Sequence, residues 1–347
     1  MRAVWYDRRG PAHEVLQIGE LPDPEPATGE VRVRVSLSGV NPGDTKKRAG
    51  WLDSPMPFPR VIPHSDGSGV VESVGPGVDA RRIGQRVWIY GAQSYRPFGT
   101  AAELVVVPSE LAVDIPDGVT DELAACLGIP GITAHRAVFA DGPVEGKTVL
   151  VNGALGGVGL LATQLAHWGG ATVIAAVRRV GDLDALDVFG AGSALSVFGA
   201  GSALDGLGTG SRFHAVSLDQ VDSAAVIRRH APEGVDRIVE VAFSDNVDLD
   251  ASVIRNGGVI AAYATRADHP SFPFWPMLFD NVTIRLLGSD DFPVAAKRAA
   301  AADLTAAARD GALMPRIDPP MPLQQVAQAH DRVDTGTRAR ILLRVTD

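Results

Sequence analysis

The sequence predicts an α/β protein that combines a doubly wound parallel sheet with a second, β-rich domain. Three observations support this prediction. They are short apolar runs separated by glycine and proline over residues 1–120, a glycine-rich turn between two nearly continuous apolar runs at 148–177, and alternating strand-like and helix-like patterns after that turn. A chain of 347 residues has the length of about two domains.

The N-terminal part has the pattern of antiparallel β-structure. Residues 31–37 alternate apolar and polar side chains, which is typical of a strand with one buried face. Glycine and proline recur at short intervals between residues 22 and 63 and supply turns. Short strands joined by such turns predict a small barrel or sandwich.

From Asp121 on, the pattern changes to that of a parallel sheet. Residues 148–154 and 172–177 are nearly continuous apolar runs, as expected for strands that are covered on both faces. Apolar residues at helical spacing over 160–168 predict a helix that ends at Gly169 and Gly170. Strand, helix and strand in this order form a βαβ unit. Further strands are predicted at 235–243, 258–264 and 281–287.

The C-terminal part is predicted to return to the first sheet. An alanine-rich helix is expected over 292–311, followed by a proline-rich stretch at 315–322 and a helix from Leu323. A final strand is expected at 338–345. This strand has the composition to rejoin the N-terminal sheet.

The composition excludes several classes of protein. A net charge of -9 argues against a broad nucleic-acid surface, because phosphate binding needs an excess of Lys and Arg. A single cysteine excludes an internal disulfide framework and a multi-cysteine zinc cluster. The first residues lack the apolar core of a signal peptide, and no apolar run is long enough to cross a membrane. We therefore expect a soluble cytoplasmic protein with no membrane or nucleic-acid partner.

An octapeptide occurs twice, at 188–195 and at 197–204. Two copies are too few for a solenoid. We interpret the duplication as an insertion tolerated in a surface loop, with one copy at the entry to a strand.

The glycine-rich turn indicates dinucleotide binding. Gly153-Ala-Leu-Gly156-Gly-Val-Gly159 follows a strand and precedes a helix, the order in which a Rossmann-type domain presents a bare backbone and a helix N-terminus to a pyrophosphate. Ala154 occupies the first glycine position of the usual frame, so the motif is looser than the consensus.

The end of the second strand distinguishes the two nicotinamide dinucleotides. NAD-binding domains place an acidic residue there, whereas a cation nearby accommodates the 2′-phosphate of NADP. Here the strand ends in Arg178 and Arg179, with no acidic residue before Asp182. This arrangement predicts NADPH, with Arg178 as the preferred partner of the phosphate.

Several motifs together resemble one superfamily. They are Ser38–Thr45 with Arg48–Gly50, Pro63–Val71, Gly131–Ala134, and Gly153–Gly159 with Gln164. By these motifs the whole chain resembles the medium-chain dehydrogenase/reductase superfamily, in particular its zinc-free quinone oxidoreductase branch, to which zeta-crystallin belongs. The resemblance implies a β-rich GroES-like catalytic domain formed by 1–124 and 291–347. It also implies a Rossmann dinucleotide-binding domain at 125–290.

The same resemblance implies that the chain binds no metal. Asn41, Ser65 and Ile129 stand where zinc-dependent relatives carry their three ligands, and none of these residue types suits catalytic zinc. His64 and Cys126 are near those positions but out of frame. We expect both to have packing roles.

Site residues follow from the resemblance. Asn41 is expected to be a polar anchor near the nicotinamide or a substrate carbonyl, and Thr133 to position the nicotinamide ribose. Lys46 is either a proton donor or cation for a developing enolate, or a solvated surface lysine. The substrate pocket is assigned to Asp44, Trp51, His64, Tyr95 and Phe98, although Asp44 is expected chiefly to hold its loop. Cofactor contacts are assigned to Asn41, Thr133, Ala154, Gly156, Gly157, Val158, Gly159, Arg178, Arg179, Val241, Ala242, Tyr263 and Arg338.

These features predict a zinc-independent, NADPH-dependent reductase of a quinone or an α,β-unsaturated carbonyl. Two alternatives remain: an enoyl-thioester reductase, for which no cationic entrance is evident, and a non-catalytic NADPH-binding protein of the crystallin type. The resemblance also implies a homodimer formed through an edge strand near 281–287.

Overall fold

The computed structural model describes residues 1–53, 55–187 and 212–346. Both copies of the repeated octapeptide lie outside the described residues. The chain divides into two compact units, each treated by itself below. Unit 1 comprises Met1–Ile132, Lys297–Arg309 and Pro315–Asp347, and unit 2 comprises Thr133–Ala296 and Asp310–Met314. The domain ranges proposed from the sequence stay a prediction.

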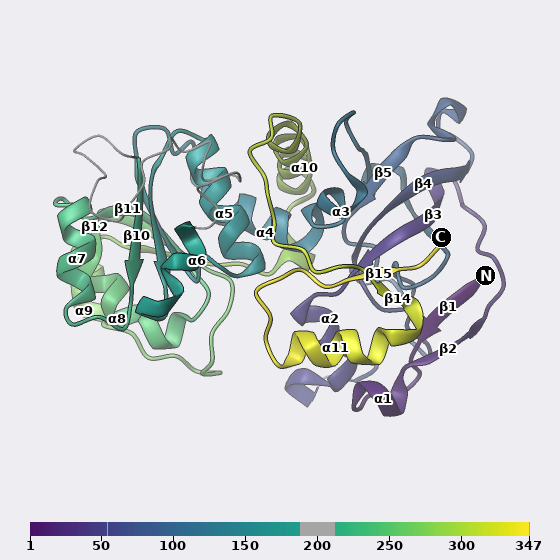
Figure 1. The fold of residues 1–347 in the computed structure, drawn as a ribbon, viewed down its shortest axis with the longest axis horizontal. Coiled ribbons are helices and arrows are strands. Elements are labelled where there is room, and N and C mark those ends of the chain that lie inside the picture. The colour runs from purple at the N-terminus through teal and green to yellow at the C-terminus, as the bar shows by residue number, and fades with distance from the viewer. Residues whose placement is uncertain (54, 188–211, 347) are drawn as a thin grey trace. The chain divides into compact units, whose positions relative to one another are not determined.

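Unit 1 is built on a seven-stranded sheet in the order β14-β15-β3-β4-β5-β7, with β6 pairing on β3 (Figure 1). Strands β1 and β2 form a separate two-stranded antiparallel sheet. The strands are β1 (Arg2–Trp5), β2 (Gln17–Glu20), β3 (Glu30–Gly39), β4 (Asp66–Val74), β5 (Arg86–Ile89), β6 (Leu104–Pro108), β7 (Ala112–Asp114), β14 (Met321–Pro322) and β15 (Leu342–Arg344).

Strand β3 shows why the alternation at 31–37 forms a sheet. Val31, Val33 and Val35 are fully buried in the core of unit 1, whereas Arg32 and Arg34 alternate with them. The predicted return of the last strand is confirmed, because β15 pairs antiparallel with β3. That strand is shorter than expected: it begins at Leu342, after a single parallel bridge between Ile317 and Arg340.

Short helices complete unit 1. They are α1 (Ala12–Val15), α2 (Pro42–Ala49), α3 (Asp121–Ala124) and α11 (Val326–Asp334). Helix α10 (Val294–Arg309) confirms the alanine-rich helix expected over 292–311, and most of its length belongs to this unit. The helix expected from Leu323 starts as one 3₁₀ turn, Leu323–Gln325, and continues as α11.

Unit 2 contains a six-stranded, wholly parallel sheet in the order β10-β9-β8-β11-β12-β13. The chain runs outward from β8 to β9 and β10, then returns to β11 on the other side of β8. The junction of β8 and β11 is thus a topological switch point, where doubly wound sheets bind ligands. The strands are β8 (Thr148–Asn152), β9 (Thr172–Val177), β10 (Phe213–Ser217), β11 (Val235–Glu240), β12 (Ile254–Ala262) and β13 (Thr283–Leu286).

Helices cover this sheet on both faces. Helix α5 packs on β8 and β9, while α7 and α8 pack on each other and on β10 and β12 (Figure 1). Coverage on two faces explains why the strands are nearly continuous apolar runs. The helices of this unit are α4 (Ile132–Phe139), α5 (Gly157–Trp168), α6 (Asp184–Asp187), α7 (Ser223–His230), α8 (Phe243–Val253) and α9 (Phe274–Phe279).

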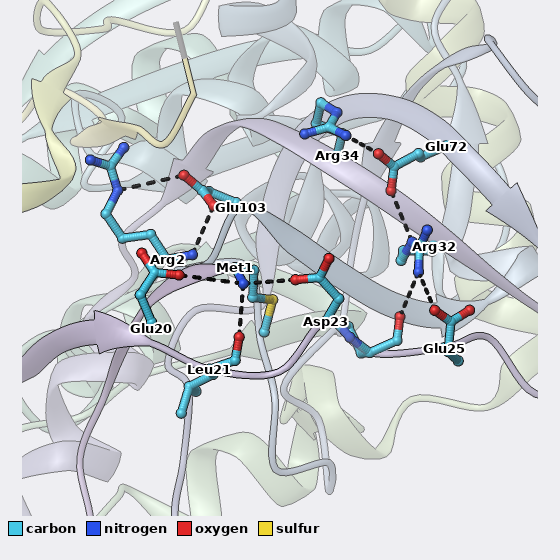
Figure 2. Close-up of polar contacts among 11 residues, drawn as sticks. Met1, Arg2, Glu20, Leu21, Asp23, Glu25, Arg32, Arg34, Glu72 and Glu103 are labelled. Atoms are coloured by element: carbon cyan, nitrogen blue, oxygen red, sulfur yellow. Dashed lines mark hydrogen bonds and ion pairs between the residues drawn. The ribbon is translucent and has the colours of Figure 1, made fainter.

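The β-sheet surface of unit 1 carries several ion pairs, which Figure 2 shows. Glu72 on β4 accepts hydrogen bonds from both Arg32 and Arg34 on β3, and the Arg32 Nε–Glu72 Oε2 distance is 2.9 Å. The carboxylate of Glu103 accepts from the backbone N–H of Arg2 at 2.7 Å. Such partly exposed pairs contribute little to stability individually, about 0–1 kcal/mol.

Within the residues described, no helix has the length and apolarity that a membrane crossing requires.

Candidate functional site

The glycine turn of unit 2 is shaped by close backbone packing. Gly153 has a φ of +72°, and a Cβ there would lie 2.7 Å from Cγ1 of Val241. A Cβ on Gly159 would collide with the carbonyl group of Gly153. At Gly157 a Cβ would meet nothing within 4 Å. The turn therefore requires glycine at 153 and 159 for its shape, and it leaves the backbone open at Gly157.

Helix α5 starts directly from this turn. Gly156 is its N-cap residue and has no side chain to bond the first-turn N–H groups. The N–H of Ala154 donates to the carbonyl of Ala176 at 3.0 Å, which fixes the turn to the end of β9. A twelve-residue helix with an uncapped N-terminus offers the partial positive charge and the N–H donors that bind a phosphate.

The predicted cofactor residues of unit 2 gather at the carboxyl edge of the sheet. Val241 and Ala242 follow β11, Tyr263 follows β12, and the exposed Arg178 and Arg179 follow β9. The register pairs Asn152 with Ala176 and Glu240 with Ala262, so these strands end at the same level. Thr133 is buried near the start of α4, in the same unit.

In unit 1 the structure builds a buried polar cluster around Asn41. Its Nδ2 donates to Oδ2 of Asp66 at 2.8 Å, and its Oδ1 accepts from Nη1 of Arg340 at 2.7 Å. Nη2 of Arg340 donates to the same Asp66 oxygen at 2.7 Å. All three side chains are at least nine-tenths buried. The amide of Asn41 is therefore held in one orientation by a carboxylate and a guanidinium.

Small residues make room for this cluster. A Cβ on Gly39 would collide with the guanidinium of Arg340, and one on Gly128 would collide with the carboxylate of Asp66. The backbone N–H of Ile129 donates to Oδ1 of Asp66 at 2.8 Å. Burial raises the pKa of Asp66, while Arg340 and the donated hydrogen bonds oppose that rise. Three donors on one carboxylate favour its ionised form.

Asp44 has the loop-holding role that the sequence suggested for it. Its Oδ2 accepts from the backbone N–H of Asn41 at 2.8 Å, which completes a capping box at the start of α2. Burial, reinforced by the charge of Asp66, raises the pKa of Asp44 to about 7. The carboxylate of Asp44 is thus bonded to the backbone of Asn41.

The aromatic residues predicted for the substrate pocket are mostly exposed. The ammonium of Lys46 lies 4.8 Å from the centroid of the Trp51 ring, a cation–π contact on the surface of unit 1. Tyr95 is 71% exposed. Phe98 lines a cavity of about 190 Å³ with Met1, Pro24, Arg96, Pro97, Leu104, Val105 and Val106. None of the other predicted pocket residues lines that cavity.

His64 was assigned to the substrate pocket and was also expected to have a packing role. It is fully buried; its Nδ1 bonds to Oγ of Ser38 at 2.8 Å and its Nε2 to Nε2 of His330 at 2.9 Å. Both ring nitrogens are thus used inside unit 1. These contacts agree with the packing role expected for His64, and its assignment to the substrate pocket stays a prediction.

The His64–His330 pair predicts a loss of stability in acid. Burial lowers the pKa of His330 to about 3 and that of His64 well below its ordinary value. Between pH 6.5, the ordinary pKa of histidine, and about pH 3, His330 is protonated in the unfolded chain but stays neutral in the folded protein. The free energy of unfolding therefore falls as the pH falls. His330 alone is expected to cost about 2 kcal/mol at pH 5 relative to pH 7.5.

Urea unfolding at these two pH values checks this expectation. His330→Gln should remove about 2 kcal/mol of the acid-side loss, whereas the exposed His13→Gln should leave it unchanged. An equal pH dependence in wild type and His330→Gln would contradict the assignment.

The predicted zinc-ligand positions do not suit a metal. Ser65 is buried, Ile129 contributes only its backbone N–H, and Asn41 is committed to Arg340 and Asp66. Over residues 1–53, 55–187 and 212–346 there is no group of three or more His, Cys, Asp or Glu side chains placed to hold a metal ion.

Arg340 was not among the site residues predicted from the sequence, and Asp66 had no predicted role. Arg338, which it assigned to the cofactor, is exposed and lies in unit 1. Residues 338 and 340 share one face of an alternating segment, so the sequence offers no means of choosing between them. The local trace of this contact in the sequence is Gly39, because a Cβ at that position would collide with the Arg340 guanidinium.

A wholly parallel doubly wound sheet with a glycine turn at its switch point, together with a β-rich unit around a buried polar cluster, defines a two-domain nicotinamide dehydrogenase or reductase fold. Residues 27–117 match the family model of the alcohol dehydrogenase GroES-like domain. The quinone oxidoreductase of Mus musculus is 30% identical over 97% of this chain and 95% of its own length. The chain belongs to the quinone oxidoreductase branch of the medium-chain dehydrogenase/reductase superfamily, a family of oxidoreductases.

Solved structures support the same fold. An NAD-dependent alcohol dehydrogenase superposes with a TM-score of 0.80 at 26% identity, covering all of both chains. A mycobacterial protein solved in complex with NADPH superposes with a TM-score of 0.77 at 24% identity, covering 99% of both chains.

Proposed function

We propose that this chain is a zinc-independent, NADPH-dependent reductase that transfers hydride to a quinone or an α,β-unsaturated carbonyl. The observation that carries the proposal is the glycine turn between β8 and α5, with Gly159 packed against the Gly153 backbone and the backbone open at Gly157. Two arginines follow the neighbouring strand β9. The family relationship to quinone oxidoreductases supports the acceptor class.

The residues of unit 2 fit a phosphorylated dinucleotide. Gly156, Gly157, Val158 and Gly159 would take the pyrophosphate at the N-terminus of α5. Arg178, with Arg179 beside it, would pair with a 2′-phosphate, because a guanidinium matches phosphate geometry. When bound, the nicotinamide supplies the hydride and therefore the difficult chemistry.

The residues of unit 1 would orient the acceptor without a metal. Asn41 keeps one N–H of its amide for a carbonyl oxygen, since the other bonds to Asp66 and the amide oxygen to Arg340. The conjugated acceptor spreads negative charge to an oxygen, which a fixed N–H donor stabilises without reorganisation. Lys46 would supply a cation near this oxygen, and Trp51 an aromatic surface for the ring.

An acceptor panel tests the proposed function. Purified protein with NADPH and separate quinones, enones and enals is expected to oxidise NADPH with at least one acceptor, followed at the absorbance of the reduced nicotinamide. Reduction of enoyl thioesters only would favour the thioester reductase. Tight NADPH binding with no turnover on any acceptor would favour a non-catalytic binding protein and overturn the proposal.

Arg178 is expected to select NADPH over NADH. Arg178→Ala should raise the KM for NADPH about tenfold or more and leave the KM for NADH unchanged, since it removes a charge-assisted contact to the 2′-phosphate alone. Steady-state kinetics with both cofactors measure this split. The matched control is Arg229→Ala on α7, another exposed arginine of unit 2. Equal effects of Arg178→Ala on both cofactors would refute the assignment.

We also propose a homodimer that forms through β13, the edge strand of unit 2. An unpaired strand edge invites a second chain, and exposed aromatic side chains lie next to it on α9. Trp275 and Phe279 stack on each other and are 65% and 71% exposed, and Leu286 on β13 is 76% exposed.

Light scattering after size exclusion tests the dimer. Leu286→Arg is expected to shift the protein to monomers, because a charge would be buried against the second copy. Val221→Arg, at another exposed apolar residue of unit 2, should leave the dimer intact. A monomeric wild-type protein would contradict the proposal.

A further inference from the structure

Two carboxyl groups are buried together under the carboxyl edge of the unit 2 sheet. Glu240 is the last residue of β11 and Asp250 lies in α8; neither has any exposed surface. Asn152, the last residue of β8 and the residue before the glycine turn, lies between them. Its Nδ2 donates to Oδ1 of Asp250 at 3.0 Å and also to Oε2 of Glu240.

The hydrogen bonds give the two acids different roles. Glu240 accepts hydrogen bonds from Asn152, from the backbone N–H of Ala242 and from Nδ2 of Asn246 at 3.1 and 3.2 Å. Asp250 shares the Nδ2 donor of Asn152 with Glu240, and burial, reinforced by the charge of Glu240, raises the pKa of Asp250 well above its ordinary value. Two adjacent buried carboxyls hold one proton between them. That proton belongs on Asp250, whose Oδ2 accepts from no donor among the described residues.

This pair is attached to both loops at the switch point. Through Ala242 it fixes the turn after β11, and Cγ1 of Val241 in that turn sits against Gly153. Through Asn152 it fixes the end of β8, from which the glycine turn departs. The carbonyl of Glu240 also accepts from the N–H of Tyr263 at 3.0 Å. One buried cluster thus sets the relative position of the segments that the proposed function assigns to the cofactor.

We propose that Asp250 is a positioning residue for dinucleotide binding: its carboxyl group donates a hydrogen bond to Glu240, and Glu240 in turn holds the Val241–Ala242 turn against the glycine turn. This inference rests on the proposed function, because it takes the cofactor to bind at this edge. Asp250 itself does not touch the ligand. Its loss should therefore weaken cofactor affinity without changing the chemistry at saturation.

Asp250→Leu and Asp250→Asn separate this role from a merely structural one. Asp250→Leu keeps the branched shape of the side chain but has no donor, and it is expected to weaken NADPH binding about tenfold or more while kcat at saturating NADPH is kept. Asp250→Asn keeps an N–H donor toward Glu240 and should restore affinity to within about twofold of wild type. Asp248→Leu, the same change at an exposed site of α8, should have no effect.

Fluorescence titration with NADPH and turnover with the best acceptor provide the readouts. Wild-type affinity in Asp250→Leu, or a loss in Asp250→Asn as large as in Asp250→Leu, would overturn the inference. If Asp250→Leu does not fold, the NADPH affinity of Glu240→Gln is measured instead. This substitution replaces one acceptor oxygen of Glu240 by a donor that faces the donors of Asn152 and Asn246. Unchanged affinity in Glu240→Gln would overturn the inference. Failure of wild type to bind NADPH would instead reject the proposed function.

Discussion

Arg340→Met is expected to lower the free energy of unfolding by about 3–5 kcal/mol. The substitution removes the guanidinium from a carboxylate, Asp66, that has no exposed surface, and leaves that charge buried without its ion-pair partner. It also frees the carbonyl end of Asn41. Turnover should therefore fall at saturating substrate, because the amide that would orient the acceptor is no longer fixed.

A double substitution isolates the ion pair. Asp66→Asn combined with Arg340→Met removes both charges and should recover a large part of the lost stability, because the penalty comes from the unpaired charge. Arg338→Met, at an exposed arginine two residues away, should change stability by less than about 0.5 kcal/mol. Denaturant unfolding of the wild type, the two single variants, the double variant and Arg338→Met measures these differences. Additive effects of the two single substitutions would contradict a coupled pair.

Gly159→Ala is expected to abolish dinucleotide binding, with an affinity loss of about a hundredfold or more, equivalent to about 3 kcal/mol. The added Cβ would collide with the backbone carbonyl group of Gly153, which cannot move aside as a flexible side chain could. The start of α5 must then move relative to the turn, and the N–H groups of its first residues move with it.

Gly157→Ala is the matched control for the effect of this substitution on the fold of the turn. It adds the same methyl group to the same turn at a place where nothing lies within 4 Å. Its melting temperature should equal that of wild type, and Gly159→Ala should melt lower. Isothermal titration with NADPH gives the affinities; wild-type affinity in Gly159→Ala would show that the turn does not bind the dinucleotide.

The sequence was sufficient for those parts of the fold that depend on local pattern. The apolar runs at 148–154 and 172–177 became β8 and β9 because buried parallel strands need apolar side chains on both faces. The predicted helix after the turn begins earlier than expected, at Gly157, so that the glycine turn and the helix N-terminus are continuous. Glycine spacing is readable because steric limits act within a few residues.

The buried clusters were not predictable in the same way. Asp66 and Arg340 are 274 residues apart, and Asn152 and Asp250 are 98 apart. Their pairing depends on the sheet order, which brings distant strand ends together, and no periodicity in a single sequence carries that information. The contact of His64 could not be predicted for a related reason: its partner His330 lies on a helix 266 residues away.

The most direct test of the central claim is an equilibrium titration of the wild-type protein with NADPH and with NADH, followed by quenching of its tryptophan fluorescence. The protein is expected to bind NADPH saturably with a Kd in the micromolar range and to bind NADH at least about tenfold more weakly. Absence of saturable binding for both dinucleotides, or tighter binding of NADH, would contradict this expectation.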